Sequence, residues 1–492
     1  MSRRSVLRAV RGPAVVAFAA IAAGAIAVAG TLVPTQRPDP AAAAVPIQGR
    51  TSSVCTTGTL GTGKGSDASE SQVFGASATA EVGATGTLTG RSLGAGDTGS
   101  PLLSIDRQGQ SKTIDSPDSS VVLVADGVMA GASAGMVYGQ TDTGEDRGLS
   151  LGPCTSPVVE QWFTGLGATA ALRSQLVLTN PDDRQAEVDL EFFGPHGLLT
   201  VPGASGLIIP AGTSRTLSLE DLLGNVGGSI SVRVKASVGR VSAISRDLRA
   251  DSHGDPTGVD WHPASAMPAD TQIIPAVPGG DGYRKLVIFN PGQRRADVTV
   301  EVLGPDGPFA PANAASVSIG PGASTTVDVA SGLAKTIGTL RVTSSQPIVS
   351  AVQSERSASK EASDIAVNTA QPPVSGMGIA PATAIDGTET EFAISNGGTT
   401  ASNADVTLYN ADGVALYHER VPVPAGASIE RRVTQAGPAF LVLRAPAGSS
   451  LYGGVTLTQS SGSVAGLAAA SFVTPGLAGR ARVPVENPRV TQ

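Results

Sequence analysis

The sequence predicts an all-β protein, in which tandem immunoglobulin-like antiparallel β-sandwich domains follow one N-terminal transmembrane or signal helix. Three observations predict this fold class. Short segments alternate apolar and polar residues, turn-forming residues separate these segments, and a block of them recurs along the chain. The composition agrees with many tight turns, since the 492 residues include 61 Gly and 34 Pro, whereas only 3% are aromatic and 15% are charged.

The first 36 residues carry the signal for export. Four arginines within residues 3–11 precede an uncharged, largely apolar run of 21 residues, 13–33. About 20 apolar residues span a bilayer, and a basic flank stays in the cytoplasm, so the rest of the chain is expected outside. Arg3 and Arg4 also resemble a twin-arginine signal. The segment is therefore either an uncleaved single-pass anchor or a signal peptide that is removed.

Residues 37–50 are rich in Pro and Ala and lack apolar periodicity, which predicts an extended linker rather than a folded element. The net charge of the whole chain is −7. Because nucleic-acid binding needs a concentrated basic face, no nucleic acid is expected as a partner.

The chain has two cysteines, Cys55 and Cys154, which are 99 positions apart. An even count in an exported protein predicts a disulfide, and closing so long a loop contributes as much as about 4–5 kcal/mol in the chain-entropy view. The alternative is a reactive thiol, but neither cysteine lies in a Cys-x-x-Cys pattern or near a histidine.

A repeated block follows the second cysteine. Asn180, Asn290 and Asn396 each end an alternating segment, and they are spaced by 110 and 106 residues. A second alternating segment follows each asparagine, as in residues 296–304, where Val298, Val300 and Val302 alternate with polar residues. Alternation with period two is typical of a strand, and the Gly and Pro residues between segments are typical of turns. Propeller blades would repeat every 40–50 residues or so, which favours sandwiches of about 105 residues.

The repeats predict the division of the chain into domains. Residues 51–156 resemble a divergent copy of the unit, because the segment from Ser120 resembles the paired final strands of the next copy. The expected domains are the signal or anchor helix 1–36, the linker 37–50, a divergent β-sandwich closed by the disulfide at 51–156, β-sandwich repeats at 157–268 and 269–372, and a repeat with a C-terminal strand at 373–492.

Three groups of residues are candidate sites. Gly131-Ala-Ser133-Ala-Gly135 matches the nucleophile-elbow pattern, but such a match arises by chance in a Gly-rich chain, and no helix is expected after it. No catalytic residue is therefore assigned. His253, Asp255, Asp260 and His262 form the densest polar cluster and are weak metal candidates; the alternative is an exposed loop leading into a strand.

Trp162 and Trp261 are candidates for a glycan-stacking platform, although in a chain so poor in aromatic residues such tryptophans are more often core anchors. No motif for a nucleotide, dinucleotide or structural zinc is present, so no cofactor is expected.

The whole arrangement resembles a known family. The basic N-terminus, the apolar helix, the cysteine-bracketed first unit, the segment from Pro157 to Phe163, and the Leu-Thr-Asn-Pro turn at Asn180 resemble the actinobacterial envelope proteins of the domain of unknown function 5719 family. That family has no assigned activity, so no functional residues are carried over. Its members are often encoded beside a large membrane glycosyltransferase, which implies a role in assembling cell-envelope glycans.

These observations predict a non-enzymatic extracytoplasmic scaffold or binding protein of the cell envelope. Its expected partners are an envelope protein or glycan, including a membrane glycosyltransferase, and the membrane itself through the N-terminal helix. The alternative is an enzyme, or a glycosyltransferase-associated subunit, that acts on envelope glycans. Converging carboxylates about 5–10 Å apart in a cleft would favour hydrolysis.

Overall fold

The computed structural model describes residues 45–46, 49–57, 70–78, 85–96, 99–312, 316–333, 336–357, 362–382, 387–460, 464–476 and 480–481. The predicted helix within residues 1–36 and most of the linker at 37–50 lie outside these ranges. No helix in the described part of the chain has the length and the apolar character needed to cross a bilayer.

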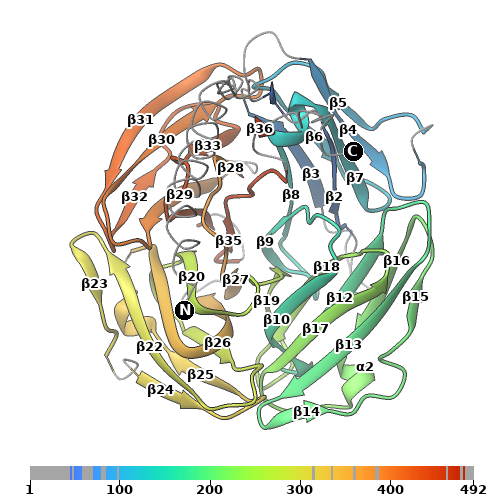
Figure 1. Ribbon diagram of the computed structural model, residues 1–492, viewed down its shortest axis with the longest axis vertical. Helices are drawn as coiled ribbons and strands as arrows, with labels where there is room; N and C mark the ends of the chain where they lie inside the picture. Colours follow the sequence, from blue (N-terminus) through green and yellow to red (C-terminus); the bar gives the residue numbers. More distant parts are fainter. Residues whose placement is uncertain are drawn as a thin grey trace, which may run out of the picture. The chain divides into compact units, whose positions relative to one another are not determined.

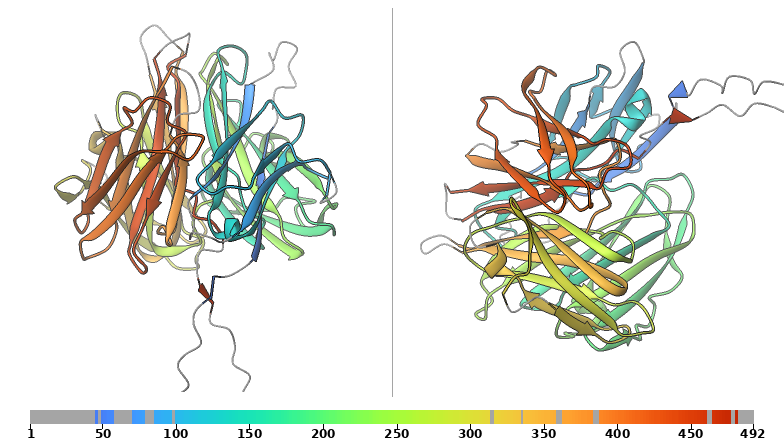
Figure 2. Two further views of the ribbon diagram at one scale, coloured as in Figure 1. Left: turned by 90° about the horizontal axis from the view of Figure 1, so that it is seen from above. Right: turned by 60° about the vertical axis from the view of Figure 1, so that its left-hand side comes forward.

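The all-β prediction is confirmed, since 61% of the described residues are in strands and 3% are in helices. Residues 47–479 form one compact unit. Outside it, β1 (Val45–Pro46) and β36 (Arg480–Ala481) pair with each other in an antiparallel two-stranded sheet. The compact unit contains four pairs of antiparallel sheets (Figures 1 and 2), numbered here in chain order.

The first pair joins an outer sheet of order β2-β7-β4-β5 to an inner sheet of order β6-β3-β8-β9. Its elements are β2 (Gly49–Cys55), β3 (Glu70–Ser77), β4 (Gly86–Ser92), β5 (Leu103–Ile105), β6 (Ser111–Asp115), β7 (Val121–Gly127), the short helix η1 (Val128–Gly131), β8 (Ser133–Thr141) and β9 (Gly148–Pro153).

The second pair has an outer sheet β10-β17-β13-β14, with β15 also on β13, and an inner sheet β16-β12-β18-β19, with β11 also on β12. Its elements are β10 (Glu160–Leu166), β11 (Ala168–Thr169), β12 (Leu172–Asn180), β13 (Ala186–Gly194), β14 (Gly197–Leu199), β15 (Leu207–Ile209), β16 (Thr213–Ser218), α2 (Leu219–Leu223), β17 (Ile230–Val238), β18 (Ser242–Ala250) and β19 (Pro256–Pro263).

In the third pair one long strand, β26, runs through both sheets. Its first half pairs with β20 and β22 of the outer sheet, and its second half pairs with β21 and β27 of the inner sheet. The elements are β20 (Ala269–Val277), β21 (Arg284–Phe289), β22 (Ala296–Gly304), β23 (Gly307–Phe309), β24 (Ser316–Ile319), β25 (Ser324–Asp328), η2 (Ala330–Gly332), β26 (Gly338–Arg356) and β27 (Asp364–Thr369).

The fourth pair repeats the pattern, with an outer sheet β28-β33-β30-β31 and an inner sheet β32-β29-β34-β35. Its strands are β28 (Met377–Pro381), β29 (Thr388–Asn396), β30 (Ser402–Tyr409), β31 (Ala415–Val423), β32 (Ser428–Arg432), β33 (Phe440–Arg444), β34 (Leu451–Gln459) and β35 (Leu467–Ser471).

All four pairs share one strand order, in which the first and second strands of a unit lie in different sheets. In the immunoglobulin arrangement the first two strands lie in the same sheet. The two-layer prediction therefore holds, whereas the connection differs from the immunoglobulin one. Turn spacing gives the number of strands, but long-range pairing decides which strands become neighbours.

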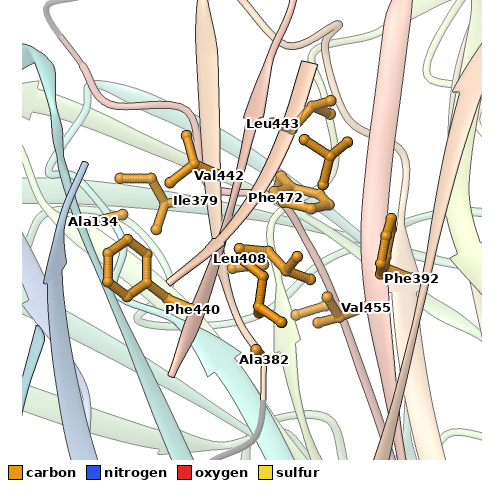
Figure 3. Close-up of a cluster of buried hydrophobic side chains, with 14 of the residues drawn as sticks. Ala134, Ile379, Ala382, Phe392, Leu408, Phe440, Val442, Leu443, Val455 and Phe472 are labelled. Atoms are coloured by element: carbon orange, nitrogen blue, oxygen red, sulfur yellow. The ribbon is translucent and has the colours of Figure 1, made fainter. Parts of the chain in front are cut away.

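Away from their first edge strands, the inner sheets are buried on both faces. In the first pair, Val73 and Val137 face the outer sheet, whereas Phe74 and Met136, one residue away on the same strands, pack against the fourth pair. Figure 3 shows this shared core, with Ala134 of the first pair near Ile379 and Phe440 of the fourth. Each inner sheet therefore joins its own pair to a neighbouring pair.

The repeated asparagines stabilise the turn after the second strand of three units. Asn180, Asn290 and Asn396 are buried, and each Nδ2 donates to the carbonyl oxygen four residues later at 2.6, 2.7 and 2.8 Å. Each Oδ1 accepts the backbone N–H two residues later at 3.1, 3.0 and 2.9 Å. Asparagine is suited to this turn because its amide both donates and accepts.

The predicted disulfide is confirmed. Cys55 at the end of β2 is bonded to Cys154, which directly follows β9. The bond therefore connects the outer sheet of the first pair to its inner sheet. It indicates that the body lies outside the cytoplasm, where disulfides persist.

Candidate functional site

The last strand of each unit lies at the centre of the compact unit (Figure 1), and β9, β19, β27 and β35 are called the central strands below. β9 contacts β19, β19 contacts β27, β27 contacts β35, and β35 contacts β9, which closes a ring of four sheet pairs. None of these four strands is ladder-paired with another among the described residues. Other groups must therefore satisfy their backbone N–H donors.

Two fully buried carboxylates supply these acceptors. Asp260 on β19 accepts the N–H of Leu151 at 3.0 Å and the N–H of Val367 at 2.8 Å. Asp364 on β27 accepts the N–H groups of Leu149 and Leu467, each at 2.8 Å. Each carboxylate therefore connects its own strand to two other units.

Burial changes the pKa of both carboxyl groups. Burial raises the pKa of Asp260 and of Asp364 well above the usual carboxyl range, although the backbone N–H donors oppose this. The charge of Asp364 raises the pKa of Asp260 further. Such shifted acids are found at catalytic sites, but here both side chains are inaccessible to solvent and engaged with backbone.

A second buried cluster joins the first and second pairs. Trp261 is 2% exposed and packs into the core of the first pair, with its Cβ 2.6 Å from the position that a Cβ on Gly152 would take. The guanidinium of Arg246 lies 5.0 Å from the Trp261 ring centre, and its Nη2 lies 3.5 Å from Asp146 Oδ1. Burial lowers the pKa of Arg246, against the charges of Asp146 and Asp260.

Ser245, Asp247 and His262 form a third buried group. His262 Nδ1 lies 2.8 Å from Asp247 Oδ2, and the Ser245 hydroxyl donates to Asp247 Oδ1 at 3.0 Å. The serine therefore contacts the carboxylate rather than the imidazole. In a hydrolytic triad the histidine must contact the serine, so this group is not arranged to activate a nucleophile.

The four weak metal candidates are not brought together. His253 and Asp255 lie in an exposed turn, in which Asp251 Oδ1 accepts both of their N–H groups at 2.8 and 3.0 Å. These two hydrogen bonds lower the pKa of Asp251. Asp260 and His262 are instead buried on β19 with the partners given above. The described residues contain no group of three or more His, Cys, Asp or Glu that could hold a metal ion.

The two tryptophans are also buried. Trp162 is 6% exposed, its ring centre lies 6.2 Å from that of Phe289, and Arg233 lies over its ring. Neither Trp162 nor Trp261 presents a ring face to a sugar, so both act as anchors between sheet pairs. Ser133 begins strand β8 rather than a turn into a helix, which is not an elbow geometry.

A cleft of about 800 Å³ lies between the first and second pairs. One wall is the solvent-facing side of the outer sheet β2-β7-β4, and the other is formed by turns of the second pair. Its described lining residues are Arg50, Thr51, Ser52, Arg91, Ser92, Gly94, Gly96, Val122, Val124, Ser156, Pro181, Asp182, Asp183, Ala211, Gly212, Arg240 and Gly476.

The described lining of this cleft combines three arginines and two aspartates with hydroxyl, glycine and small apolar residues. Arg240 makes two hydrogen bonds to Asp182, at 2.8 and 3.0 Å, and these raise the pKa of Arg240. Arg91 donates to the carbonyl of Gly99 at 3.0 Å and to the hydroxyl of Thr89 at 2.9 Å. No aromatic residue is among the described lining residues. The cleft can thus offer charge and hydrogen bonds to a ligand.

Sequence reasoning missed both Asp364 and the cleft. Aligning the repeats would have pointed to Asp364. The segment that ends at Asp364 occupies the position in its repeat that the Asp251–His262 loop occupies in the preceding one. No sequence signal pointed to the cleft, because Arg50, Arg91 and Arg240 come from three distant segments and no local pattern links them.

Comparisons with solved structures give weak likenesses. The chain is similar to a protein of Thermotoga maritima (1070), with 17% identity over 21% of this chain and 94% of that one, at a TM-score of 0.19. It is similar to a β-glucuronidase 2 of Bacteroides uniformis, with 12% identity over 48% of this chain and 26% of that one, at a TM-score of 0.11. It is also similar to the BSP domain of a biofilm associated protein, with 9% identity over 91% of this chain and 100% of that one, at a TM-score of 0.13. These TM-scores are too low to support an argument.

No curated protein matches the sequence at a significant level. A family model does match, over residues 110–434, and its description is "Family of unknown function (DUF5719)". The match covers strands from all four sheet pairs and the central carboxylates.

Proposed function

The chain belongs to the family of unknown function DUF5719, and from that premise we propose that it is a non-enzymatic scaffold or binding protein of the cell envelope. Its body consists of four tandem units, at 51–156, 157–268, 269–372 and 373–492. Each unit is immunoglobulin-like in its size and its two layers, with the strand order described above.

The observation that supports this proposal is that the buried polar side chains serve to join strands and sheet pairs. Asp260, Asp364, Arg246 and His262 are the chemically most distinctive side chains of the described body, and each is engaged in joining strands or sheet pairs. A carboxylate or imidazole held in this way strengthens the body and has no access to a substrate. A body held together in this way is suited to presenting a binding face.

The disulfide supports a location outside the cytoplasm. We add the finer proposal that residues 1–36 hold the protein in the membrane as a single pass, with the N-terminus in the cytoplasm; release after cleavage is the alternative. The partner that we propose is a cell-envelope protein or glycan, including the large membrane glycosyltransferase that the family resemblance implies.

Crosslinking in intact cells of the native host tests the proposal. The full-length tagged chain is captured from membranes, and the untagged chain serves as the control. Envelope proteins or glycan-bearing material should be enriched with the tagged chain. Enrichment of soluble cytoplasmic proteins alone would contradict both the location and the role.

A further inference from the structure

The outer sheet of the third pair carries a row of three threonines. Thr271 on β20 pairs with Thr343 on β26, and Thr343 pairs with Thr299 on β22, so the three side chains lie in one line across the strands. Val300 and Val342, which follow and precede two of these threonines, are buried in the core of the pair, so the row faces away from that core. All three threonines are exposed, and their hydroxyls have no hydrogen-bond partner among the described residues.

The second pair has charged residues at the same places. Glu160 on β10 pairs with Lys235 on β17, and Lys235 pairs with Asp189 on β13. Both sheets carry an arginine–glutamate ion pair in the next row, namely Arg233 with Glu191 and Arg341 with Glu301. The fold therefore accepts charged residues in this row, whereas the third unit has an uncharged hydroxyl at all three places.

The boundary beside this row is open, whereas the preceding boundary is filled. Between the second and third pairs, the ring centre of Phe289 lies 6.2 Å from that of Trp162 and 4.8 Å from that of Phe193. Between the third and fourth pairs, Ile273 takes the place of Trp162 in the register, and Ser395 takes that of Phe289 before the repeated asparagine. A groove of about 600 Å³, called the threonine groove below, lies here. Its described lining residues are Thr271, Thr299, Val300, Glu301, Ala310, Arg341, Thr343 and Gly397.

The charges in the threonine groove are balanced. Arg341 and Glu301 are the charged residues of the described lining, and both Nε and Nη2 of Arg341 lie 2.8 Å from Glu301 Oε2. A charged ligand would therefore find no unmatched opposite charge. The apolar lining is limited to Val300 and Ala310, so an apolar side chain of a peptide would find no pocket to fill.

Free hydroxyls in a line select a ligand that is rich in hydroxyls itself. A threonine hydroxyl both donates and accepts hydrogen bonds, as a sugar hydroxyl does. Ser316 on β24 pairs with Thr299 and is exposed, so it extends the row to four strands, which span roughly 14 Å at about 4.8 Å per strand. The groove volume lies within the range of ligand sites. No aromatic ring is in the described lining, so such a ligand is held by hydrogen bonds without stacking.

We propose that the threonine groove binds an uncharged glycan chain, whose hydroxyls exchange hydrogen bonds with Thr271, Thr299 and Thr343. The proposal rests on the envelope-binding role given above and names its site and ligand class.

Biolayer interferometry with the purified full-length protein tests this proposal. The probes are the uncharged and the acidic polysaccharide fractions of the native host's envelope, separated by anion exchange and immobilised. The uncharged fraction should bind, with an affinity that changes little as salt rises, because no ion pair forms. Absence of binding to the uncharged fraction would overturn the proposal, as would tighter binding of the acidic fraction or an affinity that falls steeply with salt.

Variants locate the binding site. Thr343→Val removes the central hydroxyl, keeps a branched side chain that suits a strand, and should weaken binding about fivefold. Thr343→Ser should retain most of the affinity, and valine at Thr271, Thr299 and Thr343 together should weaken binding about a hundredfold. Thr326→Val is the matched control, since Thr326 is an exposed threonine on β25 outside the described lining. Equal affinity of wild type and the folded triple variant would place the ligand elsewhere and sink the inference.

The two proposals fail in distinguishable ways. If crosslinking recovers envelope partners but the uncharged fraction does not bind, the groove inference fails and the envelope role stands. If the uncharged fraction binds through the threonine row but crosslinking recovers only cytoplasmic proteins, the groove is a real site and the envelope role is wrong.

Discussion

Single residues at the centre of the body act on several units at once. Asp364 lies on β27 of the third pair, yet its Oδ2 accepts N–H groups from β9 of the first pair and from the residue that begins β35 of the fourth. A buried donor left without an acceptor costs about 1–3 kcal/mol. One side chain therefore secures two contacts between units that are more than 100 residues apart in sequence.

Asp364→Asn should change how stability depends on pH. Burial raises the pKa of Asp364 in the folded state, so its contribution is fully present below the unfolded value of about 3.9 and is lost as pH rises through the folded value. The asparagine does not titrate, but its oxygen can still accept both N–H groups. Urea unfolding between about pH 4 and 8 should therefore show a smaller loss of stability with rising pH in this variant than in wild type.

Asp306→Asn is the control for this prediction, because Asp306 lies in an exposed turn. Its unfolding free energy should follow the wild-type pH dependence. Equal slopes for Asp364→Asn and wild type would show that Asp364 does not titrate with a raised pKa.

Alanine substitutions at Gly148 and Gly254 distinguish the cost of a steric clash from the cost of backbone strain. Both have positive φ, +139° and +87°, so alanine strains the backbone at either position. A Cβ at Gly148 would lie 2.4 Å from Asp364 Oδ1, whereas a Cβ at Gly254 meets nothing within 4 Å. In urea unfolding, Gly148→Ala should cost about 1–3 kcal/mol more than Gly254→Ala. Equal costs would contradict the close approach of β9 to Asp364.

At the scale of the element, the strands of inner and outer sheets differ in burial. Strand β13 of an outer sheet alternates between buried and partly exposed residues, as predicted from its sequence. All six residues of β27 are buried, so no alternation exists there to be seen. The sequence therefore revealed the strands and their turns, but not that every inner sheet packs on a second unit, because that depends on contacts between distant repeats.

The same limit applies to the candidate site. The disulfide was predictable, because Cys55 and Cys154 have only each other as partners. The polar cluster at 251–262 is visible in the sequence, but its two halves separate, since residues up to 255 lie in an exposed turn whereas Asp260 and His262 lie in a buried strand. Burial of a charged residue depends on partners from other units, which no local pattern shows.

Truncation of Trp261 should weaken the packing of strand β19 against the first pair. The ring fills space in the first core and lies against Arg246, so Trp261→Ala should lower the free energy of unfolding by about 3–5 kcal/mol. Trp261→Phe retains an aromatic ring and should cost clearly less. Thermal and urea unfolding measure both variants, and a loss below about 1 kcal/mol for Trp261→Ala would contradict the packing.

At the scale of the whole body, the closed ring favours one cooperative unit. The first and fourth pairs share a hydrophobic core in which Phe74 and Phe440 lie 6.5 Å apart. The third and fourth pairs are joined by a hydrogen bond of 2.5 Å between the hydroxyls of Thr339 and Ser395. Independent sandwiches on short linkers would lack such contacts.

Calorimetry should therefore show one unfolding transition for the full-length protein, with equal calorimetric and van 't Hoff enthalpies. Phe440→Ala should lower the temperature of that single transition, because it opens the closing contact between the fourth and first pairs. Phe309→Ala, at a position that is 46% exposed, should leave it nearly unchanged. Separate transitions in wild type would mean that the four units unfold independently.

Ring closure also constrains how this chain can evolve. Genes for open repeat arrays gain and lose copies by recombination, because an added unit only lengthens the array and each repeat contacts only its neighbours. In this body a fifth unit would have to enter between two units that already touch, and would draw Leu149 or Leu467 away from the one carboxylate that receives both. Insertion of a unit between the first and fourth units would therefore cost at least one of these two hydrogen bonds, so the closed arrangement disfavours a change in copy number there.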